Sequence, residues 1–546
     1  MKHPRVDAVI VGAGAGGGIV AKELATAGWR VVLLERGPWL KEFGHLETRD
    51  GWTTATRDIP FGPKPSEIRT VRSSDRETAR VVEPRAGLHG TLPAVVGGGS
   101  VYYGAMAWRF RPETFRMRSL LGDIPAANLA DWPLTYDDLE PFYEKAEYEL
   151  GVSGDVNPHG PARNKPLPMP PVPDNLEAGT LVPAARRIGW QPFHTPLAIL
   201  SRSYNGRPAC NGCSFCNGFG CEIGAKSSTL VTVIPEALKT GNCRLIPQAF
   251  AREITVDPRG NPDGVMFQRD GSQKWEKIAA RVIVVCASAT ETPRLLLNSK
   301  SKFHPAGIGN EHDQVGRNID NDGGLFAYGL FEEPVTDLVG PGVCFAVDEF
   351  QFRAEGVGRL GGILSNYHTR PPLAFTHRVQ VPAHVRPYGE DLKRFYRDNF
   401  LRSIWLYATC HTLPRAENRV DVDPTIRDGR GVPVSRITFR QHPRNAETEQ
   451  FMADRCADLL HEAGAKTIVK PEIVKESPAG ISTHQLGSCR MGRDTASSVT
   501  DRNGRVHGVP NVFVADGSLL GNPGGANPSL TIQALAYWVA KGIVGG

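Results

Sequence analysis

Four of the ten cysteines in the 546-residue chain fall within one twelve-residue segment, CNGCSFCNGFGC, where closely spaced thiols could bind a metal or pair as disulfides. Cys210, Cys213, Cys216 and Cys221 have the spacing C-x2-C-x2-C-x4-C. Closely following thiolates with small residues between them favour an iron–sulfur cluster. A structural zinc site usually pairs two C-x2-C units that lie further apart. Zinc, a disulfide and reduced cysteines are the alternatives.

A second pattern lies near the N-terminus, where VIVGAGAGGG has the GxGxxG spacing of a dinucleotide-binding turn. Gly12 permits the tight turn, Gly14 lets the backbone approach a pyrophosphate, and Gly17 allows close packing of a helix on a strand. Glu35 ends the next apolar segment, where a carboxylate can accept a hydrogen bond from a ribose hydroxyl. We assign the neighbouring Arg36 to the same cofactor site. The motif suits NAD and FAD equally, because both contain an ADP half.

Two other glycine-rich segments favour FAD. PAVVGGGSVYYGAMAWRF (93–110) places a tight turn before a run of aromatic residues. NVFVADGSLLGNPGGANPSLTIQALAYWVA (511–540) predicts a short strand that ends in an aspartate, a loop and a helix, which is suited to hold sugar or ribityl hydroxyls. A nucleotide domain built from both ends of a chain is typical of flavoproteins. The further residues that we assign to the cofactor site are Gly98, Gly99, Ser100, Ala251, Asp516, Gly517 and Pro528.

The elements that must position these groups follow from the pattern of apolar residues. Residues 6–35 predict a strand, a helix and a second strand, because two apolar runs flank the glycine turn and an amphipathic stretch. RVIVVCASAT (281–290) predicts a buried strand that returns to the same sheet. Residues 131–151 predict a surface helix, and a proline-rich connector follows it.

Four separated segments resemble the glucose–methanol–choline (GMC) family of FAD-dependent oxidoreductases. They are GAGAGG, VVGGGS, ASATETPRLLLNS (287–299), and the C-terminal pair THQLGSCRMG (483–492) and NPGGANPSLTIQALA (522–536). Ser288 stands where the family usually has glycine. The resemblance implies that His484 is the catalytic base and that Asn527 is its partner. A neutral imidazole with its usual pKa of about 6.5 could accept the proton of an alcohol, and an amide N–H could bind the same oxygen.

The resemblance also implies a domain order. The FAD-binding domain would have two parts, residues 1–150 and 245–324, separated by the proline-rich connector and the cysteine-rich insertion at 151–244. Residues 325–470 would form the substrate-binding domain, and residues 471–546 the C-terminal catalytic and FAD-binding segment. The expected fold class is α/β, with a Rossmann-like parallel sheet covered by helices and an α+β substrate domain whose antiparallel sheet roofs the flavin.

The aromatic residues after VVGGGS make the chain resemble the large catalytic subunit of gluconate, fructose and glucose dehydrogenases. Members of that branch hold a [3Fe–4S] cluster on three cysteines of an insertion at this place. The resemblance therefore implies a [3Fe–4S] or [4Fe–4S] cluster on the four cysteines of this chain. Electrons would leave FADH2 through the cluster to a small subunit or a cytochrome.

We accordingly expect FAD-dependent oxidation of an alcohol group of a sugar or polyol. One alternative is an alcohol oxidase that uses O2 directly and keeps the cysteines for structure. A third function, from another class, is a flavin-bearing lyase, since some relatives keep FAD without redox turnover.

The composition of the chain bears on two classes of binding partner, nucleic acids and membranes. The formal net charge of +5 is spread along the chain, which gives no reason to expect nucleic acid. No run approaches the ~20 apolar residues that span a bilayer, and the N-terminal segment predicts a strand and a glycine turn where an export signal would be apolar. We therefore expect a cytoplasmic protein without a membrane span, or a periplasmic one exported together with a signal-bearing partner subunit.

Overall fold

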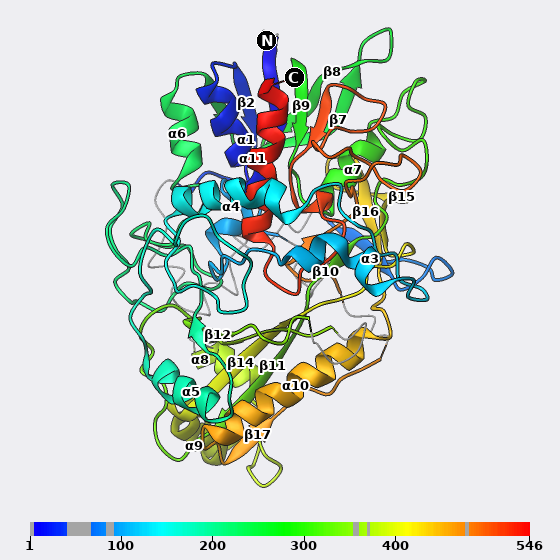
Figure 1. The fold of residues 1–546 in the computed structure, drawn as a ribbon. Coiled ribbons are helices and arrows are strands. Elements are labelled where there is room, and N and C mark those ends of the chain that lie inside the picture. The colour runs from blue at the N-terminus through cyan, green and yellow to red at the C-terminus, as the bar shows by residue number, and fades with distance from the viewer. Residues whose placement is uncertain are drawn as a thin grey trace.

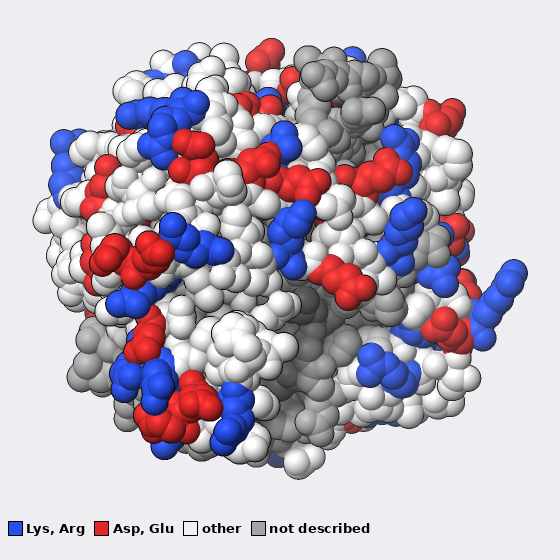
Figure 2. All heavy atoms as spheres, turned by 90° about the horizontal axis from the view of Figure 1, so that it is seen from below, with Lys and Arg blue, Asp and Glu red and all other residues white. Residues whose placement is uncertain are grey.

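The computed structural model describes residues 5–40, 67–82, 92–352, 360–367, 372–475 and 480–545. Figure 1 shows two halves: the chain termini and the strands β2 and β9 lie in the upper half, and β11, β14 and α10 lie in the lower half. The bounds of these elements are given below. Figure 2 shows acidic and basic side chains interspersed on the lower face, without a continuous basic surface there.

The upper half is built on a seven-stranded sheet with the order β6-β2-β1-β9-β8-β7, in which β19 also pairs with β9. The strands β6, β2, β1, β9 and β19 are parallel, and the apolar runs of β1 and β2 are largely buried because helices cover the sheet. The strands are β1 (Val6–Val11), β2 (Val31–Leu34), β6 (Cys243–Ile246), β7 (Ala249–Val256), β8 (Pro262–Arg269), β9 (Trp275–Val285) and β19 (Val512–Val514).

Helices from both ends of the chain pack together on this sheet. Helix α1 contacts α6 and the C-terminal helix α11, which in turn contacts α4 (Figure 1). The first and last segments of the chain therefore share one core. The helices of this half are α1 (Ala15–Thr26), α3 (Met117–Leu121), α4 (Tyr136–Leu150), α6 (Val233–Lys239), α7 (Glu291–Asn298) and α11 (Ser529–Gly545), with 3-10 turns η1 (Gly98–Val101), η2 (Pro112–Arg116) and η4 (Gly517–Leu519).

The lower half is built on a six-stranded antiparallel sheet with the order β17-β11-β14-β13-β12-β5, here called the roof sheet. Alternate residues such as Leu325 and Ala327 pack in a core with α5 and α10, so the intervening residues face the other way. Phe193, Ala346 and Ile363 on that second face join the core of the upper half. The elements are β5 (Phe193–His194), β11 (Gly323–Leu330), β12 (Phe345–Val347), β13 (Gly362–Asn366), β14 (Ser403–Cys410), β17 (Thr467–Val469), α5 (Leu176–Arg187), α8 (Pro372–Arg378), α9 (Gly389–Asn399), η3 (Phe400–Arg402) and α10 (Asn445–Glu462).

The described residues also form two small sheets. One has the order β15-β16-β3-β4, and the other pairs β10 with β18. Strand β16 pairs antiparallel with β15 on one side and in parallel with β3 on the other, so this part of residues 325–470 forms a sheet separate from the roof sheet. No described helix has both the length and the apolar composition needed to cross a bilayer. The strands are β3 (Arg69–Arg72), β4 (Arg80–Val82), β10 (Asp320–Asn321), β15 (Arg419–Arg427), β16 (Pro433–Thr438) and β18 (Gln485–Leu486).

Candidate active site

A pocket opens where the carboxyl ends of β1, β9 and β19 meet the first turn of α1. This is where ligands bind in open α/β sheets. Segments from across the chain line it, including the turn at 98–100, strand β7 and residues 483–485. The predicted residues that line the pocket are Gly12, Gly14, Glu35, Arg36, Gly98, Gly99, Ser100, Ala251, His484, Asp516, Gly517 and Pro528.

The three glycines of the GxGxxG turn have different surroundings. Gly12 has φ +102°, and a Cβ there would lie 2.3 Å from the carbonyl oxygen of Cys286. Gly17 does not line the pocket. A Cβ at Gly17 would lie 1.9 Å from the carbonyl oxygen of Gly12, so only glycine lets α1 pack this closely on the turn. A Cβ at Gly14 would meet nothing within 4 Å. Gly14 therefore leaves open space beside the N-terminus of α1, where a pyrophosphate would meet unpaired N–H groups.

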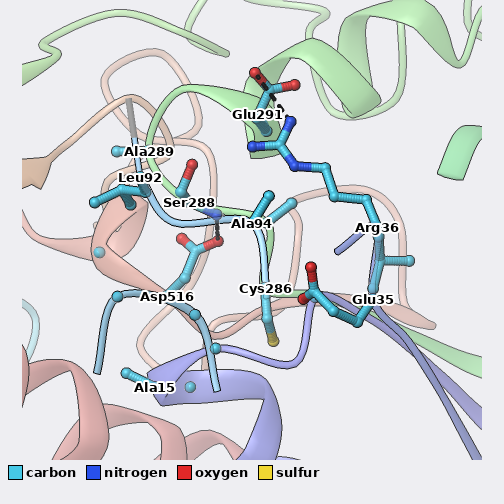
Figure 3. A pocket seen from close by; sticks show the side chains of 18 of the residues that line it. Ala15, Glu35, Arg36, Leu92, Ala94, Cys286, Ser288, Ala289, Glu291 and Asp516 are labelled. Carbon is cyan, nitrogen blue, oxygen red and sulfur yellow. Dashed lines mark hydrogen bonds and ion pairs between the residues drawn. The ribbon is translucent and has the colours of Figure 1, made fainter. Parts of the chain in front are cut away.

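Glu35 and Arg36 lie at one side of the pocket (Figure 3). The carboxylate of Glu35 accepts hydrogen bonds from the N–H groups of Ala13 (2.9 Å) and Gly37 (2.8 Å). Burial raises its pKa. The guanidinium of Arg36 extends toward Glu291, with 3.9 Å between Nη1 and Oε1. Both side chains are thus held by the protein beside the space that a ribose would enter.

Asp516 ties two turns of the pocket together (Figure 3). Its Oδ2 accepts from the N–H of Ser288 (2.9 Å) and from the hydroxyl of Thr292 (2.6 Å), while Oδ1 accepts from the N–H of Ser518 (2.8 Å). Burial raises the pKa of this carboxyl. Ser288 has φ +90°, in the left-handed region that favours glycine. The position where the sequence departs from the family pattern is therefore a strained turn that lines the pocket.

Gln485 was missed by the sequence reasoning. Its Oε1 accepts from the hydroxyl of Thr290 (3.1 Å), but its buried Nε2 has no hydrogen-bond partner among the described residues. Gln485 lines the pocket, so a bound cofactor could supply the missing acceptor. In the sequence, only its place directly after His484 could have indicated that Gln485 belongs to the cofactor site. With the open cradle at Gly14 and the carboxylate of Glu35, this unpaired donor fits a dinucleotide such as FAD.

His484 lines the same pocket, and its partner Asn527 lies beside it, directly before the lining residue Pro528. Their Nε2 and Nδ2 atoms lie 2.9 Å apart, and Asn527 Oδ1 accepts a hydrogen bond from Trp108 Nε1 (3.1 Å). His484 precedes β18, and Asn527 lies two residues before α11. Burial lowers the pKa of His484 to about 4, below the ordinary value that the sequence led us to expect. The imidazole is therefore neutral at physiological pH and able to accept a proton.

The four cysteines of residues 210–221 are not assembled into a metal site. No group of three or more His, Cys, Asp or Glu side chains in the described parts of the chain is placed to hold a metal ion. The four thiols are free, with Cys213 exposed and Cys216 buried. In the absence of a metal, burial raises the pKa of Cys216 to about 12. The structure therefore does not support the predicted iron–sulfur cluster.

A buried ammonium holds this cysteine loop (residues 210–221) instead. Lys226 Nζ donates to the carbonyl oxygens of Cys216 (2.5 Å), Phe219 (2.6 Å) and Tyr103 (3.0 Å). Burial lowers the pKa of Lys226 to about 8. The N–H of Gly218 donates to the carbonyl of Tyr102 (2.8 Å), so the loop packs on the segment that follows the turn at 98–100.

The cysteine loop also contacts the lower half. The carbonyl of Gly212 accepts from the N–H of Gly340 (3.1 Å). The amide of Asn217 donates to the hydroxyl of Tyr367, which directly follows β13 in the roof sheet. The loop therefore bridges the two halves of the molecule.

Known proteins match this chain along nearly its whole length. Residues 92–322 and 414–536 match the GMC oxidoreductase family. Paromamine 6'-oxidase from Streptomyces fradiae is 30% identical over 99% of this chain and 91% of that protein. The fructose dehydrogenase large subunit from Gluconobacter japonicus is 27% identical over 98% of this chain and 97% of that protein.

Solved structures agree on the fold. Pyridoxine 4-oxidase from Mesorbium loti superposes with a TM-score of 0.65 at 16% identity, over 98% of both chains. The predicted α/β fold with a separate antiparallel sheet is confirmed. Since the two family matches together cover more than half of the chain and a relative of 30% identity spans almost all of it, the protein belongs to the FAD-dependent GMC oxidoreductases.

Proposed function

We propose that the protein oxidises a CH–OH group of a sugar or polyol, with His484 as the base and Asn527 as its partner. The observation that carries the proposal is the 2.9 Å approach of His484 Nε2 and Asn527 Nδ2 beside the cofactor pocket. When bound, FAD supplies the acceptor for the hydride of the substrate.

The two side chains offer complementary groups to one hydroxyl. The neutral imidazole of His484 presents a lone pair at Nε2, which can take the hydroxyl proton. The amide of Asn527 presents an N–H, which can donate to the hydroxyl oxygen as negative charge develops there. Because the two nitrogen atoms are neighbours, a single hydroxyl group can replace their mutual contact and use both. Proton removal from oxygen and loss of hydride from the adjacent carbon then yield a carbonyl product.

The substrate class is supported by the relatives. The two relatives described above are named for a sugar and for paromamine. The half-buried rings of Phe326, Tyr367 and Tyr407 pack together on the roof sheet, but Arg378 lies over two of them and none of the three lines the cofactor pocket. The roof sheet therefore adds no support of its own.

Anaerobic addition of substrates to the FAD-loaded protein tests this function. A panel of sugars, sugar acids, polyols and aminoglycosides should include compounds that bleach the flavin absorbance and are recovered as carbonyl products. A panel in which no compound bleaches the flavin would contradict the proposal. Conversion of an alcohol without bleaching would favour the lyase alternative.

For the electron acceptor we propose a partner protein in place of O2, as in a dehydrogenase. The cysteine loop supports this, because it packs on the segment after the pocket turn at 98–100 and carries the exposed Cys213. The iron–sulfur cluster, the small subunit or cytochrome partner and the cellular location stay predictions. Iron and acid-labile sulfide in the purified protein would support the relay. Their absence, together with one peroxide formed per turnover in air, would identify an oxidase with structural cysteines.

A further inference from the structure

We propose that Trp108 is a positioning residue for alcohol oxidation, because its indole N–H sets the orientation of the Asn527 amide and thereby the tautomer of His484. This inference rests on the proposed roles of His484 and Asn527. It names a third member of the site, which lies 419 residues before Asn527 in the chain.

The indole of Trp108 is held firmly. Its side chain is buried and packs edge to face on Phe193, with ring centroids 6.0 Å apart at an interplanar angle of 77°. On one side, the N–H of Ala107 donates to the carbonyl of Pro196 (2.8 Å). On the other, Arg109 forms a buried ion pair with Glu147, with 2.7 Å between Nη2 and Oε2. Trp108 therefore presents its N–H in one fixed direction.

The chemistry of the indole decides which way the Asn527 amide points. An indole N–H can only donate, so the amide atom 3.1 Å from Trp108 Nε1 must be the oxygen. The amide NH2 group must then face His484. The backbone contact between Gly525 N–H and Asp322 Oδ1 (2.9 Å) holds the loop before Asn527, but it does not distinguish the two orientations of the amide.

The amide orientation in turn fixes the imidazole. The NH2 group of Asn527 can only donate, so His484 Nε2 must accept and the imidazole proton must lie on Nδ1. This tautomer leaves a lone pair on the nitrogen that faces the substrate. A flipped amide would present its oxygen to His484 and favour a proton on Nε2, which removes the base. Trp108 thus acts on the reaction through Asn527, without contact to the reacting atoms.

Replacement of the indole by a phenyl ring tests the N–H. Trp108→Phe keeps a six-membered aromatic ring against Phe193, and it removes the indole N–H together with the five-membered ring that carries it. Trp132→Phe is the matched control, because Trp132 is also buried but its Nε1 has no hydrogen-bond partner among the described residues. We expect Trp108→Phe to slow anaerobic flavin reduction at saturating substrate by about tenfold to a hundredfold, with a change of less than about threefold in the apparent substrate dissociation constant. Equal rates in the two variants would overturn the proposal.

A double-mutant cycle separates positioning from a general packing defect. In the Asn527→Ala background, Trp108 has no amide to orient, so Trp108→Phe should slow flavin reduction by less than about twofold. A further loss as large as in the wild-type background would show that Trp108 acts by another route. The FAD content of each variant should match that of the wild type.

The tautomer of His484 gives a readout that needs no turnover. In protein labelled with ¹⁵N-histidine, the His484 signals are assigned by their loss in His484→Gln. We expect a protonated Nδ1 and an unprotonated Nε2 in the wild type, and a mixture of tautomers in Trp108→Phe. A protonated Nε2 in the wild type would overturn the inference even in an active enzyme. If His484 has the expected tautomers but no alcohol reduces the flavin, the result would instead count against the proposed function alone.

Discussion

The His484–Asn527 pair and the cysteine loop both have residue types that can do chemistry, but only the pair is brought together from distant segments of the chain. His484, Asn527 and Trp108 come from three distant segments and meet within hydrogen-bond distance. The four cysteines are neighbours in sequence, and yet no metal-binding group forms among the described residues. Convergence of distant residues therefore gives the proposed base and its partner a geometry that local spacing did not give the four cysteines.

Burial shifts the pKa in opposite directions in the two regions. It lowers the pKa of His484 to about 4, which keeps the imidazole in the neutral form that a base requires. It raises the pKa of Cys216 to about 12, so this thiol stays protonated as long as no metal binds it. The same desolvation thus favours the uncharged form of both side chains.

Loss of the base should have the largest effect. We expect His484→Gln to lower turnover with an artificial electron-accepting dye by about a thousandfold, while FAD stays bound. A variant with all four loop cysteines changed to serine should keep dye-linked turnover within about threefold of the wild type, because no thiol contacts the His484–Asn527 pair. If the cysteine variant loses as much turnover as His484→Gln does, alcohol oxidation depends on the cysteine loop as strongly as on the proposed base, which would contradict this prediction.

The cysteine loop should depend on Lys226 for its shape. Lys226→Met leaves three buried carbonyl groups without their donor, which we expect to lower the free energy of unfolding by about 3 kcal/mol. The loop thiols should also react faster with a thiol reagent. Lys239→Met is the control, since Lys239 is 71% exposed and pairs with the neighbouring Glu236 on the surface, and it should change stability by less than about 0.5 kcal/mol. Equal stability of the two variants would show that the ammonium does not hold the loop.

The strained turn at Ser288 should give a smaller effect of the opposite sign. Ser288→Gly relieves a positive φ and should stabilise the FAD-loaded protein by about 1 kcal/mol. Ser288→Ala removes the same hydroxyl but keeps the Cβ, so it should bring no such gain. Thermal unfolding of both variants makes the test. A stabilised Ser288→Ala would assign the effect to the hydroxyl in place of the backbone.

Local motifs predicted the upper half well. The GxGxxG turn, the strand that ends at Glu35 and the segments with His484 and Asn527 carry their signals in neighbouring residues. Ser288 was visible as a departure from the family pattern, although its φ was not. The sequence also placed the four cysteines together, but it could not show that burial would keep Cys216 protonated.

Features that depend on distant partners could not be predicted. The segment 433–438 has a strand pattern and pairs with the neighbouring residues 419–427, but its second partner, residues 69–72, lies more than 350 residues away. The unpaired Nε2 of Gln485 and the contact of Trp108 with Asn527 exist only because separate loops converge. The pKa of His484 depends on the same enclosure.

The pH dependence of anaerobic flavin reduction tests the central claim most directly. Because His484 in the folded protein has a pKa of about 4, the base is neutral above that pH and becomes protonated below it. The second-order rate constant of reduction at low substrate concentration, which reports groups of the free enzyme, should therefore stay level from pH 8 to about pH 5 and fall by half near pH 4. His484→Gln should show a low rate without this acid limb. An acid limb that persists in His484→Gln, or a wild-type rate that does not fall in acid, would contradict the assignment of His484 as the base.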